Sequence, residues 1–151
     1  MKNIELIIKR ISKSFNDIQL PQYATEGSSG MDVRATIDES ITLGSGKIVL
    51  VPTNLSIEIP IGYEIQVRPR SGLAAKHGIG ILNSPGTIDS DYRGEIKIIL
   101  FNFSDEDFII NRGDRIAQLV IAEVIVAKII ESNSLNSSNR GEGGFGHTGK
   151  S

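Results

Sequence analysis

The chain has 151 residues, of which 39% are hydrophobic and 23% charged, and its formal net charge is -2. This length suffices for one ordinary hydrophobic core, so we expect a single domain. The charge provides no general basic field, which argues against direct binding to nucleic acid. There is no cysteine, and this excludes disulfide bonds, thiolate metal sites and a cysteine nucleophile.

The first ten residues place Glu5, Lys9 and Arg10 around a very short apolar stretch. This stretch has neither the apolar region of a signal peptide nor the length of a membrane span. We therefore expect a cytoplasmic protein with no membrane association.

Apolar and polar residues alternate with a period of two along much of the chain, as in strands with one face in water. The alternation is clearest at residues 4–9, 55–59 and 63–68. Further runs rich in β-branched residues lie at 47–51, 95–101, 108–110 and 116–130, with turn signals between them. Many short strands at this spacing predict an all-β sandwich or barrel.

One short helix is expected over residues 72–77. Ser71 precedes it as a candidate N-cap, and Gly78 follows it at the position where the left-handed conformation favours glycine. One or two turns of helix cannot form a layer, so the predicted class stays all-β.

The composition changes at Glu131, after which residues 132–139 have too little apolar surface to offset their ordering entropy. We therefore expect a β-barrel domain over residues 1–130, followed by a linker and a mobile glycine-rich arm over 131–151. Glycine amides in the arm can surround phosphate oxygens, Arg140 can neutralise them, and Phe145 can stack on a base. The alternative is a disordered, solvating tail.

Polar residues that suit an anionic ligand follow Pro69. Arg70 and Ser71 place a cation and a hydroxyl at the start of the expected helix, where unpaired amides attract an anion. The alternative is a helix cap beside a surface arginine.

Three other segments offer candidate residues. Asn83–Lys97 is expected to form a hairpin that carries Asp89 and Tyr92. Asp32 lies beside Gly30, and for it, as for Asp89, the alternative is a turn former. Gln118 faces away from its apolar neighbours and can donate to a phosphate or to solvent.

Taken together and in this order, five segments resemble the five motifs of the trimeric dUTPase family. They are Gly30–Ala35, Pro69–Ala74, Gly86–Gly94, Arg112–Leu119 and Arg140–Gly149. One short motif is weak evidence, but five in order across almost the whole chain are not expected by chance. The departures are small: Met31 and Val33 stand where other apolar residues are common, and His147 stands where serine is common.

The resemblance implies a jelly-roll-like subunit in a homotrimer, with active sites built from more than one subunit and the arm of one subunit closing over the site of another. It also implies hydrolysis of dUTP to dUMP and pyrophosphate with Mg²⁺ as the cofactor. Such an activity limits uracil incorporation into DNA and supplies dUMP for dTMP synthesis.

The resemblance also implies roles for individual residues. Asp89 is the general base for the water that attacks the α-phosphorus, and Asp32 holds waters of a Mg²⁺ ion bound to the triphosphate. The implied phosphate-binding residues are Arg70, Ser71, Gly72 and Gln118, with Arg140 and the amides near Gly146 and Thr148 at the γ end.

Substrate specificity is implied to come from the expected hairpin. Its backbone, with Asn83, Thr87, Ile88 and Lys97 nearby, complements uracil, whereas cytosine would leave buried groups unpaired. Tyr92 packs on the deoxyribose and leaves no room for a 2′-hydroxyl, and Phe145 covers the uracil.

Two other functions remain open at this stage. dCTP deaminase resembles the family in fold and would release ammonia, but the arm and Tyr92 favour dUTPase. A nucleotide-sensing module that binds dUTP and signals through partners could dispense with Asp89, so the combination of Asp32, Asp89 and the arm favours an enzyme.

Overall fold

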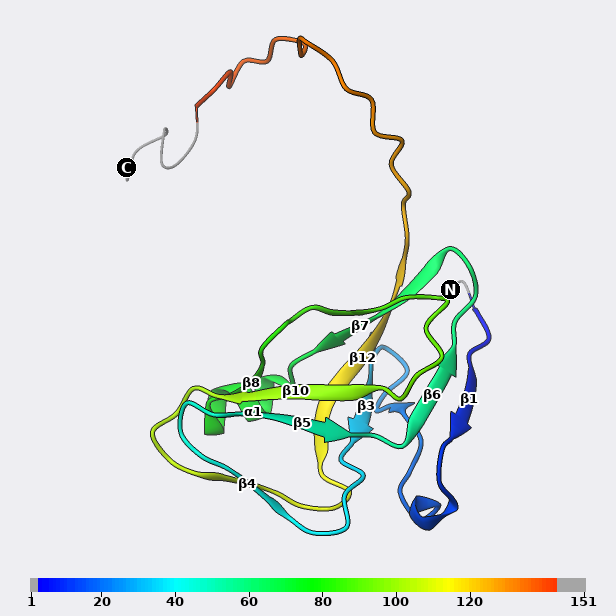
Figure 1. Cartoon of the computed structure of the whole chain (residues 1–151), viewed down its shortest axis with the longest axis vertical. Coiled ribbons are helices and arrows are strands. Elements are labelled where there is room, and N and C mark those ends of the chain that lie inside the picture. The colour runs from blue at the N-terminus through cyan, green and yellow to red at the C-terminus, as the bar shows by residue number, and fades with distance from the viewer. Residues whose placement is uncertain (1–2, 144–151) are drawn as a thin grey trace.

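Short antiparallel strands dominate residues 3–143, the part of the chain that the computed structural model describes (Figure 1). The strands are β1 (Ile7–Arg10), β2 (Gln22–Tyr23), β3 (Gly30–Arg34), β4 (Ile41–Leu43), β5 (Ile48–Pro52), β6 (Leu55–Glu58), β7 (Tyr63–Arg68), β8 (Ile79–Ile81), β9 (Gly86–Ile88), β10 (Lys97–Asn102), β11 (Phe108–Ile110) and β12 (Arg115–Glu123). Helix α1 (Ser71–His77) and a 3-10 turn at Lys13–Phe15 complete the regular elements of these residues. The all-β prediction is confirmed.

Apart from β2 and β3, the strands that pair are not consecutive in the chain, as expected for a jelly-roll-like fold. The orders are β2-β3-β12-β7-β9, β5-β10-β8, β11-β4 and β1-β6. The inward faces of these sheets share one hydrophobic core, in which Ile65, Ile98 and Leu119 are fully buried. None of the helices within residues 3–143 has the length and apolar character needed to cross a membrane.

The period-two pattern correctly assigns the buried faces. Leu55, Ile57 and Ile59 are only 2–3% exposed, whereas the intervening Glu58 is exposed. In β7, Ile65 and Val67 are buried as predicted. Alternation therefore sufficed where one face of a strand meets the core and the other meets water.

The ends of helix α1 agree with the sequence prediction at one terminus only. Gly78 has φ of 64°, and its N–H bonds back to the last turn, as predicted. The N-cap prediction is wrong, because Arg70 occupies that position in an extended conformation and Ser71 is the first helical residue. Arg70 makes no side-chain cap bond, since its guanidinium bonds to residues on other strands.

The predicted hairpin over Asn83–Lys97 is also wrong as a simple hairpin. Strand β9, inside this segment, pairs with β7, whereas β10 pairs with β5 and β8. The chain thus crosses from one sheet to another and back between β8 and β10. Period and turn signals cannot report such an exchange of partners, because it depends on strands distant in sequence.

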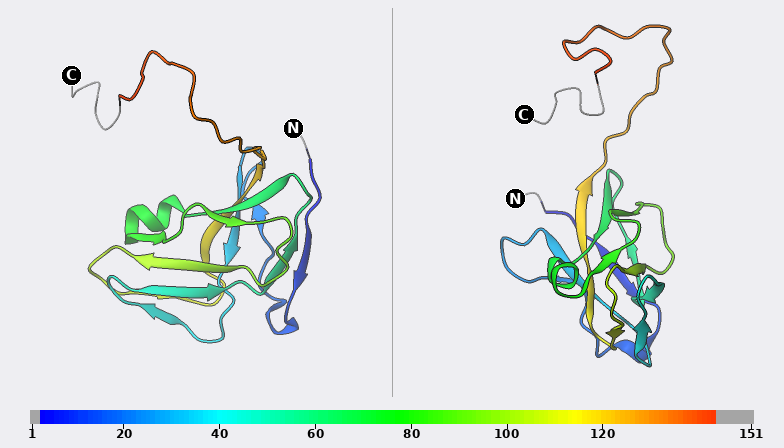
Figure 2. Two further views of the ribbon diagram at one scale, coloured as in Figure 1. Left: turned by 45° about the horizontal axis from the view of Figure 1, so that its top comes forward. Right: turned by 90° about the vertical axis from the view of Figure 1, so that its left-hand side faces the viewer.

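The run at 116–130 does not continue as one strand. β12 ends at Glu123, and the chain then leaves the body of the protein in an extended path (Figures 1 and 2). Ile125, Ile129 and Leu135 are 94%, 87% and 93% exposed. Beyond Glu123 the apolar pattern persists, but no neighbouring strand pairs with it within the described part of this chain.

Candidate active site

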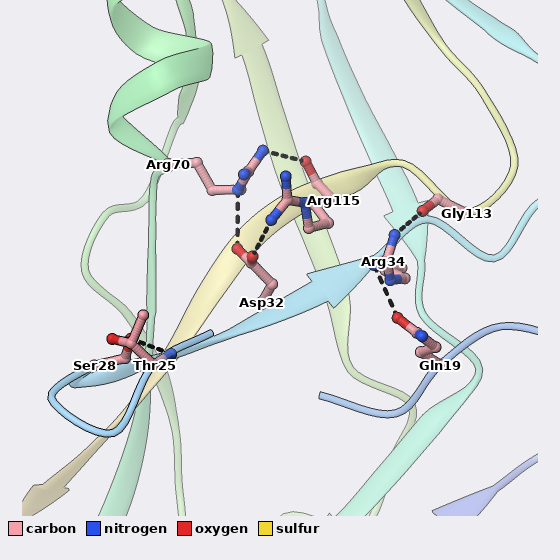
Figure 3. Close-up of polar contacts among 8 residues, drawn as sticks. All are labelled: Gln19, Thr25, Ser28, Asp32, Arg34, Arg70, Gly113 and Arg115. Carbon is pink, nitrogen blue, oxygen red and sulfur yellow. Dashed lines mark hydrogen bonds and ion pairs between the residues drawn. The ribbon is translucent and has the colours of Figure 1, made fainter. Parts of the chain in front are cut away.

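Two groups of polar residues lie on the outer surface of the β-sheets. The first, here called the Asp32 cluster, consists of Asp32, Arg70 and Arg115 (Figure 3). Asp32 Oδ1 accepts a hydrogen bond from Arg70 Nε and Oδ2 accepts one from Arg115 Nη1, each at 2.9 Å. Arg70 Nη1 donates to the Arg115 carbonyl at 3.1 Å, so each member contacts the other two.

The pairing of β3 with β12 positions this cluster beside Gln118. Asp32 lies opposite Gln118 in the register, and both side chains are half-buried on the outer face. A Cβ at Gly30 would lie 2.6 Å from Gln118 Oε1, so the Gln118 amide rests directly over the glycine backbone. Gly30 therefore provides the space that Gln118 occupies.

Helix α1 begins next to the Asp32 cluster. Arg70 reaches Asp32, and the two residues that follow it, Ser71 and Gly72, are exposed. Arg70 and Asp32 are 38 residues apart in the chain, and they meet because β3 and β7 lie on either side of β12.

The second group surrounds a cavity of about 420 Å³, here called the loop cavity. Its walls come from β9, the segment between β9 and β10, and the first residue of β10, with one residue from β5. The lining residues are Leu50, Thr87, Ile88, Asp89, Tyr92, Glu95, Ile96 and Lys97. Five of the residues predicted to bind nucleoside or act on it thus lie around one cavity: Thr87, Ile88, Asp89, Tyr92 and Lys97.

The connection between β5 and β6, together with Ser56 of β6, holds the loop that lines this cavity. Thr53 Oγ1 donates to the Ile96 carbonyl at 2.6 Å, the Asn54 N–H donates to Glu95 Oε1 at 3.0 Å, and Ser56 Oγ donates to the Arg93 carbonyl at 2.7 Å. Asn54 has φ of 59°, a left-handed conformation that asparagine tolerates better than most residues. The loop is therefore tied to a second turn by several independent bonds.

Tyr92 is held in the loop by a close fit. Its hydroxyl donates to the Glu95 carbonyl at 3.0 Å, and its ring lies over Gly94. A Cβ at Gly94 would come within 2.9 Å of Tyr92 Cε2 and closer still to Cζ and Oη. Only glycine at position 94 leaves room for the Tyr92 ring in this position.

Several predicted site residues do not line the loop cavity. Within the described residues, none of the Asp32 cluster lines the loop cavity, and neither do Asn83 and Gln118. Arg140 lies on the extended segment, where its Nε donates to the Gly143 carbonyl at 2.6 Å. Phe145, Gly146 and Thr148 lie outside the described residues.

The donor set limits how a metal ion can be held. Residues 3–143 contain no group of three or more histidine, aspartate and glutamate side chains placed to bind one. Asp32 accepts from two arginines, yet each carboxylate oxygen retains a further lone pair. This arrangement fits a Mg²⁺ ion that is carried by a phosphate ligand and reached through water, rather than a protein cage.

Sequence reasoning missed Arg115 and Glu95. Arg115 is three positions from Gln118, and in a regular strand residues at odd spacing face opposite sides. A β-bulge between Arg115 and Ala117 removes that difference. The only feature of the sequence that indicates this bulge is the pair of consecutive apolar residues Ile116 and Ala117, both of which are buried.

Comparison with known proteins gives the family of the chain. The dUTPase family model matches residues 16–149. A deoxyuridine 5'-triphosphate nucleotidohydrolase from Fusobacterium nucleatum is 59% identical over 133 residues, covering 88% of this chain and 91% of that protein. One from Rickettsia prowazekii is 51% identical over 149 residues and covers 99% of both chains.

Solved structures extend the agreement to the fold. The dUTPase of Staphylococcus bacteriophage 80alpha with dUPNHPP has a TM-score of 0.85 and 26% identity, covering 98% of this chain and 100% of that one. A dUTPase from phage phi11 of S. aureus, described with a structural Mg(II) ion, has a TM-score of 0.77 at 21% identity, covering 89% and 100%. The chain therefore belongs to the dUTPase family.

Proposed function

We propose that the protein hydrolyses dUTP to dUMP and pyrophosphate, in a homotrimer whose active sites are shared between subunits. The observation that carries the proposal is the loop cavity, which gathers the carboxylate of Asp89 with Thr87, Tyr92 and Lys97. Its relatives are named for this activity. The protein would act in the cytoplasm, where it would limit uracil incorporation into DNA and supply dUMP for dTMP synthesis.

The carboxylate of Asp89 is the general base. It follows β9 directly, and it is exposed at the edge of the cavity, where a water molecule can reach it. The carboxylate takes a proton from this water while the water oxygen bonds to the α-phosphorus. The bond from the α-phosphorus to the bridging oxygen breaks, and pyrophosphate leaves.

The Asp32 cluster and its neighbours receive the phosphates. Arg70 and Gln118 offer donors on one face, and Ser71 and Gly72 lie exposed beside them. A Mg²⁺ ion carried by the triphosphate would neutralise part of its charge, and Asp32 would hold that ion through its waters.

The loop cavity selects the nucleoside. Ile88 and Leu50 form its apolar walls, and the loop backbone provides donors and acceptors for the uracil edge. Asn83, just before β9, lies near this backbone, with its amide nitrogen against Gly86. Tyr92 packs on the deoxyribose and excludes a 2′-hydroxyl.

An apolar sheet face supports assembly. On the outer side of β5-β10-β8, Phe101 pairs with Ile48 and Gly80, and Ile99 pairs with Leu50. Ile48, Leu50, Leu82 and Phe103 are 49–67% exposed in the single chain. Contiguous apolar surface of this kind marks a protein interface.

Leu50 belongs both to this apolar face and to the loop cavity. A second subunit seated on the face therefore borders the cavity, which accounts for the separation of the loop cavity from the Asp32 cluster within one chain. The arm then closes the site, with Arg140 and the amides near Gly146 and Thr148 at the γ-phosphate and Phe145 over the uracil.

The deciding experiment measures pyrophosphate release from dUTP by the purified protein, with and without Mg²⁺. dCTP, dTTP and UTP serve as comparison substrates, and ammonia is measured with dCTP. We expect rapid, Mg²⁺-dependent release from dUTP alone. Ammonia from dCTP would identify a deaminase, and tight binding of dUTP without turnover would identify a sensing module.

A further inference from the structure

The Asp32 cluster contains one residue, Arg115, that has no role in the proposed mechanism. Arg115 donates Nη1 to Asp32 Oδ2 and its carbonyl accepts from Arg70 Nη1, so it is bonded to both partners (Figure 3). The Arg115 side chain is 46% exposed, whereas those of Asp32 and Arg70 are 17% and 21% exposed. Arg115 is thus the most exposed member of the cluster.

A backbone irregularity gives Arg115 this position. Arg115 pairs with Arg34 and Ala117 pairs with Val33, so Ile116 is an extra residue in β12. Ile116 and Ala117 both point into the core, at 2% and 0% exposure. Because of this bulge, Arg115 emerges on the same face as Gln118 and Asp32.

The neighbouring cation does not compete for the same carboxylate. Arg34 lies opposite Arg115, but its guanidinium donates to the Gly113 carbonyl at 2.8 Å and to Gln19 Oε1 at 3.0 Å (Figure 3). Asp32 therefore has two arginine partners, and the three groups together carry a formal charge of +1. Without Arg115, Asp32 would pair with Arg70 alone, and that pair would be neutral.

We propose that Arg115 is a positioning residue for the triphosphate end of the substrate. By holding Oδ2 of Asp32, it fixes the carboxylate in one orientation and shares its negative charge, so that Arg70 remains available to phosphate oxygens. Arg70 already uses Nε and Nη1 within the described residues, which leaves Nη2 for the ligand. This inference rests on the proposed function, which assigns the phosphates of dUTP to the Asp32 cluster.

The test measures the Kd of dUpNHpp, a non-hydrolysable dUTP analogue, and of dUMP in the presence of Mg²⁺. We expect R115Q to weaken dUpNHpp binding about tenfold while changing dUMP binding less than about twofold, since dUMP lacks the outer phosphates. R115K retains the charge without the planar fork and should recover part of the loss. The matched control is R112Q, which removes another arginine–carboxylate pair, that of Arg112 with Asp17 at 2.7 Å, and should leave both constants unchanged.

A double-mutant cycle separates action through Asp32 from direct contact with the ligand. In a D32N background, R115Q should cost less than about twofold in dUpNHpp binding, because the carboxylate that Arg115 holds is already gone. An undiminished loss in that background would overturn the proposal, as would an equal loss of dUMP binding. Normal dUpNHpp binding by R115Q defeats the inference alone, whereas a wild-type protein that neither binds dUpNHpp nor cleaves dUTP defeats the proposed function with it.

Discussion

At the scale of single residues, Asp89 decides whether the loop cavity is catalytic. Asp89→Asn keeps the shape and hydrogen-bonding reach of the side chain but cannot accept a proton. We expect kcat to fall by about two to four orders of magnitude, the range of general base catalysis, with little change in Kd for dUpNHpp. Stopped-flow or steady-state pyrophosphate release measures kcat, and a near-normal value would remove Asp89 from the role of base.

Gly94 determines the position of the Tyr92 ring, and this role can be tested by substitution. The Cβ of Gly94→Ala would collide with the Tyr92 ring, which must then move and lose its bond to the Glu95 carbonyl. We expect the ratio of kcat/KM for dUTP over UTP to fall about tenfold, because the displaced ring no longer packs on the sugar. Gly27→Ala is the control, because its Cβ would meet no atom within 4 Å. A ratio that Gly94→Ala leaves unchanged would show that the sugar is selected elsewhere.

At the scale of elements, the β5–β6 connection supports the loop between β9 and β10. Thr53 is 3% exposed, and its hydroxyl is buried against the Ile96 carbonyl. Thr53→Val leaves that carbonyl unpaired and should lower the free energy of unfolding by about 1–3 kcal/mol. Ser56→Ala removes a bond at the surface and should cost no more than about 0.5 kcal/mol. Urea denaturation of both variants gives the comparison, and equal costs would show that burial does not distinguish the two bonds.

At the scale of the whole molecule, the apolar face of β5-β10-β8 is the proposed contact between subunits. Ile48→Lys puts a charge into that face, beside Phe101 on the neighbouring strand, and should shift the protein from trimer to monomer at micromolar concentration. Dissociation should abolish most of the activity if, as proposed, each site is built from more than one subunit.

Ile109 provides a matched control for this substitution. It is 56% exposed, as is Ile48, but it lies on β11 outside the proposed face. Sedimentation equilibrium or light scattering should find Ile109→Lys in the wild-type state of association. A monomeric wild-type protein, or an Ile48→Lys variant that assembles normally, would exclude this face as the interface.

The sequence by itself determined the class of fold, the buried faces of the clearest strands and the set of five motifs. These features are local: alternation depends on neighbouring residues, and the left-handed end of α1 depends on Gly78 alone. The resemblance to a known family, rather than local periodicity, selected Asp89 and Tyr92 as candidate site residues, and both line the loop cavity.

The tertiary structure alone decided which strands meet. It paired β9 with β7 rather than with β10, and it ended β12 at Glu123. It also placed Arg70, rather than Ser71, at the N-cap position, with the Arg70 side chain hydrogen-bonded to Asp32. It also turned Arg115 to the face of Gln118 through a bulge. Each outcome depends on partners far apart in sequence, and a local period of hydrophobicity carries no information about the strand that will lie alongside.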